Sequence, residues 1–404
     1  MLRNLLLRVL LLLAAAAAPA AAAFVHPGII VTRPMLDQIR LDVRARREPT
    51  YSAFRWAQSG TVMPGCNVSS RCNVTLGSLS YVPHPTRAVP DNTVAAWPEK
   101  EDAAAAYTHA LLWYISKDVR HAEKAMEIMD GWSAIFRAQE SAKSAGLVAG
   151  WVGSLWPRAA EIIRHTYHGW PASSVARFEH MLTSIYLPLV ERGSDTNGNW
   201  GLAMTEAAFG IGIFTDNKTI ADRALALWRV QAPAYLYVSS DGTTPRRPPV
   251  ERRWPQTWPN CGPGCTNQQI VKYWHGQKTF TGHDGLCQET CRDLGHTQMG
   301  IATLGNVAET AHHQGIDLWG ENRARIVAAA EFHASLMSDA PAGVYQPAPS
   351  WLTCTGAAER VGEAKYPPGG GVIAANGSTF EVSPAPACPK HLTTRLTQTV
   401  SADR

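Results

Sequence analysis

The densest group of side chains able to do chemistry lies in residues 288–297, which read Gln-Glu-Thr-Cys-Arg-Asp-Leu-Gly-His-Thr. A mostly apolar run, Met299 to Leu304, follows and is typical of a helix. Burying polar groups on such a helix is costly unless they line a wet groove or close an ion network, and a solvated outer face is the alternative. Four polar residues have the i, i+3, i+4 and i+7 spacing of one helical face: Glu289, Arg292, Asp293 and His296.

The neighbouring sequence favours the groove. Residues 273–275 read Tyr-Trp-His and residues 282–285 read Gly-His-Asp-Gly, an unusual density of aromatic and polar groups beside a plain surface helix. Glu289 and Asp293 suggest a pair of glycosidase carboxylates, but on a single helix both would share one side of a site. The chain has no G-x-S-x-G, Walker or H-E-x-x-H motif, and no G-x-G-x-x-G after a strand. Serine-nucleophile, nucleotide and zincin chemistry therefore have no support.

The elements that must position these residues are mainly helical. Amphipathic spacing predicts four antiparallel helix pairs of comparable length with short turns. Such pairs indicate an all-α fold, an (α/α) toroid (an incomplete helical barrel) with long disulfide-stapled loops, not a bundle around one axis. The predicted pairs are 102–115 with 120–136, 156–168 with 173–187, 199–214 with 219–230, and 294–315 with 320–337.

Two proline-rich regions, 60–98 and 240–290, are predicted to be loops. Loops of that length inside a compact domain are usually functional.

Residues 1–23 have a positive start, an apolar centre and small residues before Phe24, which predicts a signal peptide. We expect one helical-toroid domain over 24–340, completed by a Pro/Gly-rich segment over 341–404.

The cysteines and glycosylation sequons point to the secretory route. Eight cysteines fall into four sequence pairs, and their even number suits an oxidising compartment. A four-thiolate zinc site from the two central pairs is the alternative. Connectivity stays open, because eight cysteines allow about 105 pairings. The pairs are Cys66/Cys72, Cys261/Cys265, Cys287/Cys291 and Cys354/Cys388, and the sequons are at Asn67, Asn73, Asn217 and Asn376.

Composition limits the partners. The formal charge is +4, and removing Arg3 and Arg8 with the signal peptide leaves +2. That balance excludes a typical nucleic-acid binder, so any preference for an acidic polymer must be local. Residues 246–253 hold four arginines, either as such a local site or as an exposed basic loop.

After the signal peptide no stretch reaches the roughly 18 uninterrupted apolar residues of a membrane span, so we expect a secreted, extracellular monomer.

Several motifs extend from residue 26 to about 300. They are His26–Ile30, Asp102–Tyr107 with Leu111, Trp113 and Tyr114, Arg158–Ile162, Asn197–Trp200, Tyr273–Gln277 and Gln288–Thr297. Together they resemble the alginate lyase superfamily, and most closely the helical-toroid polysaccharide lyases of family 38, which act on alginate or glucuronan. The last motif is the most specific, whereas the alanine-rich helix is weak on its own.

The resemblance implies a site. Such lyases use an Asn from the Asn-Trp motif, a Glu, a His seven residues later, and a downstream Arg and Tyr. In this chain the implied catalytic residues are Asn199, Glu289, His296, Arg360 and Tyr366, with Tyr345 as second choice for the tyrosine. Substrate-binding residues are expected to be Trp200, Tyr273, Trp274, His275, Gln288 and Arg292. The expected partner is an acidic uronan, and the expectation includes no metal and no other cofactor.

These residue types suit β-elimination independently of the family. An amide donor (Asn199), a protonated carboxyl (Glu289) and an imidazole (His296) can neutralise the C5 carboxylate of a 1,4-linked uronan. A tyrosine can then remove the C5 proton and protonate the leaving O4 in glucuronan or polymannuronate, whereas guluronate would need His296 as the base. Each residue also has a structural interpretation: Asn199 as a helix N-cap, His296 as a core histidine and Tyr366 as a loop tyrosine.

Two other functions remain open at this stage. One is a glycoside hydrolase on a helical toroid, with Glu289 and a second acid. The other is a non-catalytic uronan-binding protein that keeps the groove. A lyase differs from both because its products carry a C4=C5 double bond that absorbs ultraviolet light. The sequence does not decide which uronan is the substrate, or between endo and exo action.

Overall fold

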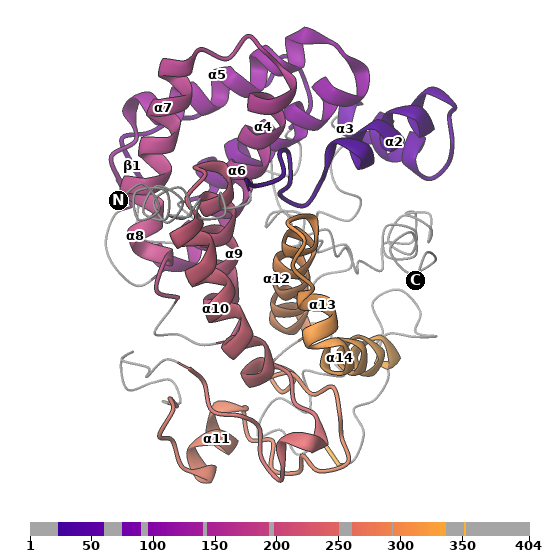
Figure 1. The fold of residues 1–404 in the computed structure, drawn as a ribbon, viewed down its shortest axis with the longest axis vertical. Coiled ribbons are helices and arrows are strands. Elements are labelled where there is room, and N and C mark those ends of the chain that lie inside the picture. Colours follow the sequence, from indigo (N-terminus) through magenta and orange to yellow (C-terminus); the bar gives the residue numbers. More distant parts are fainter. Residues whose placement is uncertain are drawn as a thin grey trace, which may run out of the picture.

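The computed structural model describes residues 23–59, 75–89, 96–139, 144–193, 198–249, 261–292, 294–336 and 351–352. These residues form a mainly helical fold, an incomplete (α/α) toroid, drawn in Figure 1. No helix among them is both long and apolar enough to cross a bilayer. Most of the predicted signal peptide and of the segment 341–404 lies outside the described residues.

The helices are α2 Arg33–Arg44, α3 Thr50–Ser59, α4 Trp97–Ser116, α5 Val119–Ile135, α6 Ala145–Thr166, α7 Ala172–Met181, α8 Leu187–Val190, α9 Asn199–Phe214, α10 Lys218–Tyr235, α11 Asn267–Tyr273, α12 Leu294–His313, α13 Leu318–Glu321 and α14 Arg323–Ser335. A π-helical turn, Leu182–Tyr186, joins α7 to α8, and a 3₁₀ turn spans Ser239–Asp241. Two short strands, β1 Ala88–Val89 and β2 Ala138–Gln139, pair in parallel.

Four helices, α4, α6, α9 and α12, pack side by side in sequence order and run in the same direction. Near their starts Lys100 of α4 lies 4.5 Å from the ring centre of Trp151 of α6, and near their ends Trp113 donates to Thr166. For α6 and α9, Gly150 faces Ala203 and Gly210 faces Pro157. We call these four the inner helices. Because they are parallel, their N-termini lie at one end of the toroid.

The start of α6 differs from the prediction. The sequence predicts a helix from 156, whereas α6 begins at Ala145. The missed turns contain Gly146, Gly150 and Gly153, which lower helix propensity. In the fold these glycines let α6 approach α9 closely, since a Cβ at Gly150 would lie 3.1 Å from the backbone nitrogen of Met204. Tertiary packing therefore overrides local preference here.

The inner helices are tied together by one layer of polar side chains, which we call the belt. Arg158 of α6 is 1% exposed and forms an ion pair with Glu206 of α9. The same Glu206 oxygen accepts a hydrogen bond from Asn306 of α12 at 3.1 Å. The Arg158 guanidinium also lies 6.0 Å from the ring centre of Tyr107 of α4. The belt thus links all four inner helices at mid-height.

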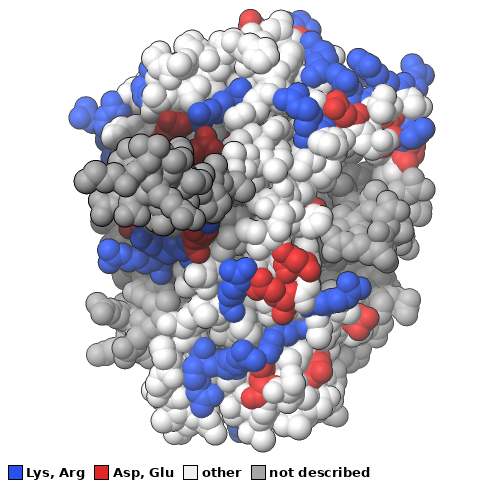
Figure 2. Space-filling model, in the orientation of Figure 1, with Lys and Arg blue, Asp and Glu red and all other residues white. Residues whose placement is uncertain are grey.

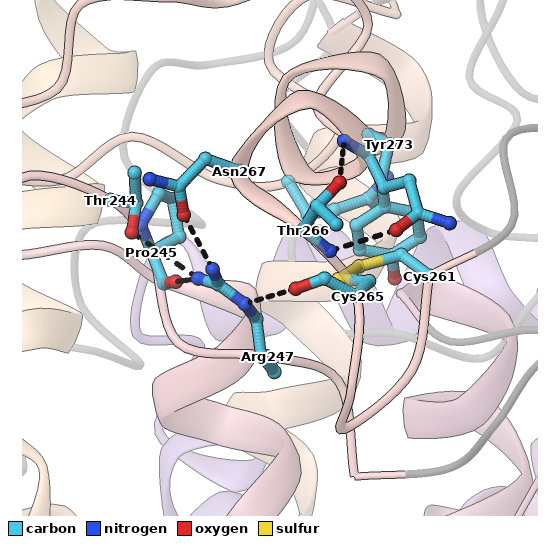
Figure 3. The surroundings of a disulfide bond; sticks show 10 residues. Thr244, Pro245, Arg247, Cys261, Cys265, Thr266, Asn267 and Tyr273 are labelled. Carbon is cyan, nitrogen blue, oxygen red and sulfur yellow. Dashed lines mark hydrogen bonds between the residues drawn. A yellow bond between two sulfur atoms is a disulfide. The ribbon is translucent and has the colours of Figure 1, made fainter.

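The remaining loops pack around a second apolar cluster that includes Tyr237, Trp274 and Phe280. The described parts of region 240–290, residues 240–249 and 261–290, are mostly non-helical as predicted, but they contain the short helix α11. Cys261 and Cys265 form a disulfide just before α11 (Figure 3). Arg247 braces the same loop, because its guanidinium donates to the Cys265 carbonyl oxygen at 2.9 Å and to Asn267 at 2.6 Å.

The zinc alternative for the central cysteines is wrong. Cys261 and Cys265 are joined to each other, and Cys291 is also disulfide-bonded, which leaves Cys287 as a free, buried thiol. Burial raises the pKa of Cys287 well above its usual value, so it stays neutral beside His333. The other four cysteines, Cys66, Cys72, Cys354 and Cys388, lie outside the described residues.

Surface charge is mixed. On the face drawn in Figure 2, basic and acidic side chains stand in small groups with uncharged surface between them. Of the four arginines in 246–253, Arg246 pairs with Asp241 at 2.7 Å and Arg247 is committed to the disulfide loop, while Arg252 and Arg253 lie outside the described residues. The two described arginines therefore serve the local structure.

The belt generates the first prediction. Arg158→Met leaves the buried Glu206 carboxylate without its cation, so we expect the free energy of unfolding to fall by about 3–5 kcal/mol. The matched control is Arg223→Met, which removes an exposed pair with Glu191 and should cost less than about 1 kcal/mol. Urea unfolding of both variants measures this. Equal losses would show that the belt does not hold the helices.

The buried side chain of Glu99 generates the second prediction. Glu99, at the start of α4, is 0% exposed and accepts from the Tyr186 hydroxyl at 2.5 Å and Gln139 at 2.6 Å. Burial raises its pKa from 4.5 to about 7. Between these pH values the folded chain keeps a proton that the unfolded chain releases, so stability should fall as pH rises through this window, by about 3 kcal/mol in total.

Unfolding in urea at several pH values tests this. Glu99→Gln carries no titrating proton and should remove this part of the pH dependence, whereas the exposed Glu127→Gln should keep it. A wild-type curve that rises from pH 4.5 to 7 with the same slope as Glu99→Gln would contradict the assignment.

Candidate active site

The candidate site lies where α9 begins and where the chain turns into α12. The backbone N–H of Asn199, the first residue of α9, donates to Glu289 Oε2 at 3.3 Å. Asn199 is 1% exposed and Glu289 is 4% exposed. Gly198 precedes them with φ +83°, and a Cβ there would lie 2.6 Å from Gln288 Oε1, so only glycine fits this approach. Two sequence motifs 90 residues apart are therefore joined directly.

Glu289 is held by three groups. Its Oε1 accepts a hydrogen bond from the Arg292 guanidinium at 2.9 Å. Its Oε2 accepts the Asn199 N–H and also lies 3.2 Å from the Tyr235 hydroxyl. Burial raises the pKa of Glu289, while the charges of Arg292 and His296 act in the opposite direction. This carboxyl takes up a proton more readily than an ordinary glutamate, which is the property that the predicted neutral acid requires.

His296 reaches the site from the first turn of α12 and interacts electrostatically with Glu289. The predicted common helical face is wrong for Glu289 and Arg292. They precede α12, in turns where the Arg292 N–H donates to the Glu289 carbonyl oxygen at 2.8 Å. Asp293 lies outside the described residues. The spacing of Glu289 and His296 thus brings them together through a turn and not through a continuous helix.

Tyr235, at the end of α10, was missed by the sequence analysis. Its hydroxyl touches Glu289 and lies 3.3 Å from the Thr297 carbonyl oxygen. A Cβ at Gly300 would lie 2.0 Å from this hydroxyl, so the tyrosine is seated against α12. Burial and the Glu289 charge raise its pKa far above the usual value. Tyr235 therefore positions Glu289 as a hydrogen-bond donor. The only sequence signal is a tyrosine just past the predicted end of helix 219–230.

The predicted substrate-binding residues occupy different environments. Trp200 is half-buried at the start of α9, Arg292 is half-buried in the turn before α12, and His275 is half-buried after α11. Tyr273 and Trp274 are buried in the second apolar cluster. Gln288 is buried too and donates to the Tyr273 carbonyl oxygen at 2.7 Å, so the aromatic pair supports the loop that carries the site. Arg360, Tyr366 and Tyr345 lie outside the described residues.

The Asn199 side chain is the least satisfied group here. Its Nδ2 and Oδ1 are buried and have no hydrogen-bond partner among the described residues. It is not an N-cap: Gly198 holds that position, and no side chain caps α9. A buried amide left without partners costs about 1–3 kcal/mol, a cost typical of a group kept for a ligand.

This generates the third prediction. Asn199→Leu keeps the volume and removes the unsatisfied amide, so the free energy of unfolding should stay the same or rise by about 1 kcal/mol. The control on the same helix is Thr205→Val, whose hydroxyl is hydrogen-bonded to Gln231 at 2.8 Å, and which should lose about 1 kcal/mol. A loss above about 2 kcal/mol for Asn199→Leu would mean that the amide serves the fold.

Comparisons with known proteins bear on the fold and the family of this chain. Residues 89–247 match the family model described as alginate lyase. The fold is similar to that of alginate lyase A1-III. A tyrosine-to-phenylalanine variant of that enzyme, complexed with tetrasaccharide, aligns with a TM-score of 0.52 at 15% identity. The alignment covers 79% of this chain and 80% of that one. A histidine-to-alanine variant complexed with tetrasaccharide gives 0.52 at 16% identity, covering 80% and 81%.

Alginate lyase A1-III from Sphingomonas species A1 aligns with a TM-score of 0.49 at 14% identity, covering 78% of this chain and 80% of that one. No curated protein matches the sequence. The closeness to family 38 stays a prediction. The family match and the shared fold together confirm that this chain resembles the alginate lyase superfamily.

Proposed function

We propose that this chain is a polysaccharide lyase that cleaves a 1,4-linked uronan, alginate or glucuronan, by β-elimination. The observation that carries the proposal is the pairing of Asn199 with Glu289. The backbone N–H of Asn199 donates to a buried carboxyl whose pKa is raised, and the side-chain amide of Asn199 has no hydrogen-bond partner among the described residues. The match to the alginate lyase family supplies the reaction class.

The toroid's polarity favours an acidic substrate at this place. The inner helices begin at the same end, and α9 and α12 begin within the site itself. The N-terminus of a helix carries a partial positive charge and free N–H groups, so it stabilises anions. A uronate carboxylate bound there gains this stabilisation although the protein's net charge is small.

The proposed chemistry starts with the C5 carboxylate of the sugar. Asn199 donates an N–H, Glu289 donates its proton and His296 adds its ring N–H, so that the carboxylate charge is neutralised. The C5–H bond then becomes acidic enough to break. Its electron pair forms the C4=C5 double bond while the C4–O4 bond breaks.

The proton moves of this reaction need a base and an acid. We propose Tyr366, with Tyr345 as second choice, to take the C5 proton and to protonate O4, and Arg360 to assist. With guluronate, where the two groups lie on opposite faces, His296 takes the role of base. Tyr235 acts through Glu289, since its hydroxyl is already committed at 3.2 Å.

We further propose that the protein is secreted. The predicted signal peptide supports this, and the Cys261–Cys265 disulfide is typical of an oxidising compartment. The glucuronan or alginate substrate would then be met outside the cell. Detecting the purified culture-medium form with its N-terminus near Phe24 would test this part separately.

The fourth prediction is an absorbance assay at the unsaturated-uronate band with polymannuronate, polyguluronate and glucuronan supplied separately. We expect a rise with at least one polymer. His296→Ala and Asn199→Leu should each lower kcat by about 10²–10³, because each removes a donor to the developing charge. The control His180→Ala changes an exposed histidine on α7 and should retain full activity.

The outcomes separate three functions. A flat trace with new reducing ends would identify a glycoside hydrolase and overturn the lyase. No product from any polymer, with retained binding, would indicate a uronan-binding protein. An absorbance rise that survives both substitutions would place the chemistry outside the Asn199–Glu289–His296 site.

A further inference from the structure

A second polar cluster lies at the other end of α6. Glu161 and His165 stand one helical turn apart in the last turns of α6, and His26 comes from the segment that precedes α2. Glu161 is 1% exposed, and both of its oxygens lie 3.0 Å from His26 Nδ1. His165 Nε2 lies 3.6 Å from Glu161 Oε1. One ligand atom from each residue falls within 4.8 Å of the others.

We propose that His26, Glu161 and His165 form a binding site for a divalent transition-metal ion, with Zn²⁺ as the probe. Two imidazoles and one carboxylate are a ligand set that zinc and its neighbours favour. Bonds of about 2.0–2.1 Å in a tetrahedron separate the ligand atoms by roughly 3.3 Å. The observed separations of 3.0 Å and 3.6 Å lie on either side of that value.

The surroundings orient these side chains as the outer groups of metal sites do. His26 Nε2 lies 3.0 Å from Asp216 Oδ1, at the end of α9, so the ring can donate there and leave Nδ1 facing Glu161. The Gly28 N–H donates to Glu161 Oε2 at 3.1 Å and fixes the carboxylate. A histidine ligand that gives its other N–H to a carboxylate is the usual arrangement around bound metals.

One movement is required. The rings of His26 and His165 are stacked, with centroids 4.4 Å apart and planes 8° apart. A ligated ion lies near the plane of each ring, so His165 must turn out of the stack to bind the same ion as His26. Its side chain is 25% exposed, which gives it room to turn.

The competing arrangement is a metal-free cluster in which a shared proton and hydrogen bonds hold the three side chains together. We call it the protonic clasp. In it, His26 is an imidazolium held between Glu161 and Asp216, and no metal is needed. The His165 ring argues for the ion. Its Nε2 is buried and lies 3.6 Å from Glu161 Oε1, just beyond hydrogen-bond distance. A metal ion would bond to both atoms, whereas the protonic clasp leaves them as a long ion pair.

The ion would fasten the N-terminal segment to the end of the toroid. That segment already reaches α12 and the loop after it, through the Ile30 N–H on Thr310 at 3.2 Å and the Val25 N–H on Gln314 at 2.8 Å. Ligation would add a cross-link from His26 to α6. Because this cluster lies at the far end of α6 from Asn199, it is separate from the proposed catalytic site.

The test uses the full folded chain, stripped with EDTA and titrated with Zn²⁺ by calorimetry. We expect one ion per chain and a higher Tm. His165→Ala removes a partly exposed ligand without touching the hydrogen bonds of His26, and should abolish this binding. Asp216→Asn should weaken it about 10–100-fold. His180→Ala is the control and should bind as the wild type does.

Co²⁺ gives an independent signal, because a visible ligand-field spectrum should appear in the wild type and disappear in His165→Ala. Lyase-assay activity or the far-ultraviolet circular dichroism of each variant shows that it is folded. Absence of stoichiometric Zn²⁺ binding to the wild type would overturn the proposal in favour of the protonic clasp. Binding that persists unchanged in His165→Ala would overturn it as well.

Discussion

The ion pair between Arg158 and Glu206 fixes how α6 and α9 lie against each other, and most of the structure follows from that register. A guanidinium that is 1% exposed is tolerated only when it is paired and its partner is held in place. Asn306 of α12 donates to Glu206, and the ring of Tyr107 of α4 lies beside the Arg158 guanidinium. On the N-terminal side of the belt, the glycines of α6 let its backbone approach the backbone of α9 closely. With α9 positioned in this way, its first residue, Asn199, lies where Glu289 can accept the backbone N–H.

The site contains polar groups that are less well satisfied than those of the belt. Asn199 keeps two buried polar atoms without partners, and Glu289 keeps a carboxyl that burial pushes toward the neutral form. Both features oppose folding and favour a ligand with its own carboxylate. Tyr235 limits the cost, because its hydroxyl gives Glu289 a fixed donor and packs against Gly300. Tyr235 thus offsets part of the cost of burying Glu289.

Features that depend on residues close together in the sequence could be predicted, whereas features that depend on residues far apart in the sequence could not. Amphipathic spacing gave the helical fold and most helix pairs, because burial of one face is a local pattern. It missed the first turns of α6, whose glycines make sense only against α9. The motifs named Asn199, Glu289 and His296, but their contact depends on a turn and on Tyr235, 54 residues from Glu289. Tyr273 and Trp274 were predicted to bind the substrate, and only the fold shows that they are buried in an apolar cluster.

The shared direction of the inner helices gives the toroid two ends of opposite electrostatic character. Where α9 and α12 begin, the positive ends of the helix dipoles favour an anion, and Asn199 and His296 lie at that end. Where α6 and α9 finish, the negative ends of the helix dipoles favour a cation, and Glu161, His165 and Asp216 lie there. The proposed uronan site at one end and the proposed metal site at the other are therefore both favoured by the parallel packing of the inner helices. An antiparallel arrangement of the same four helices would weaken both sites together.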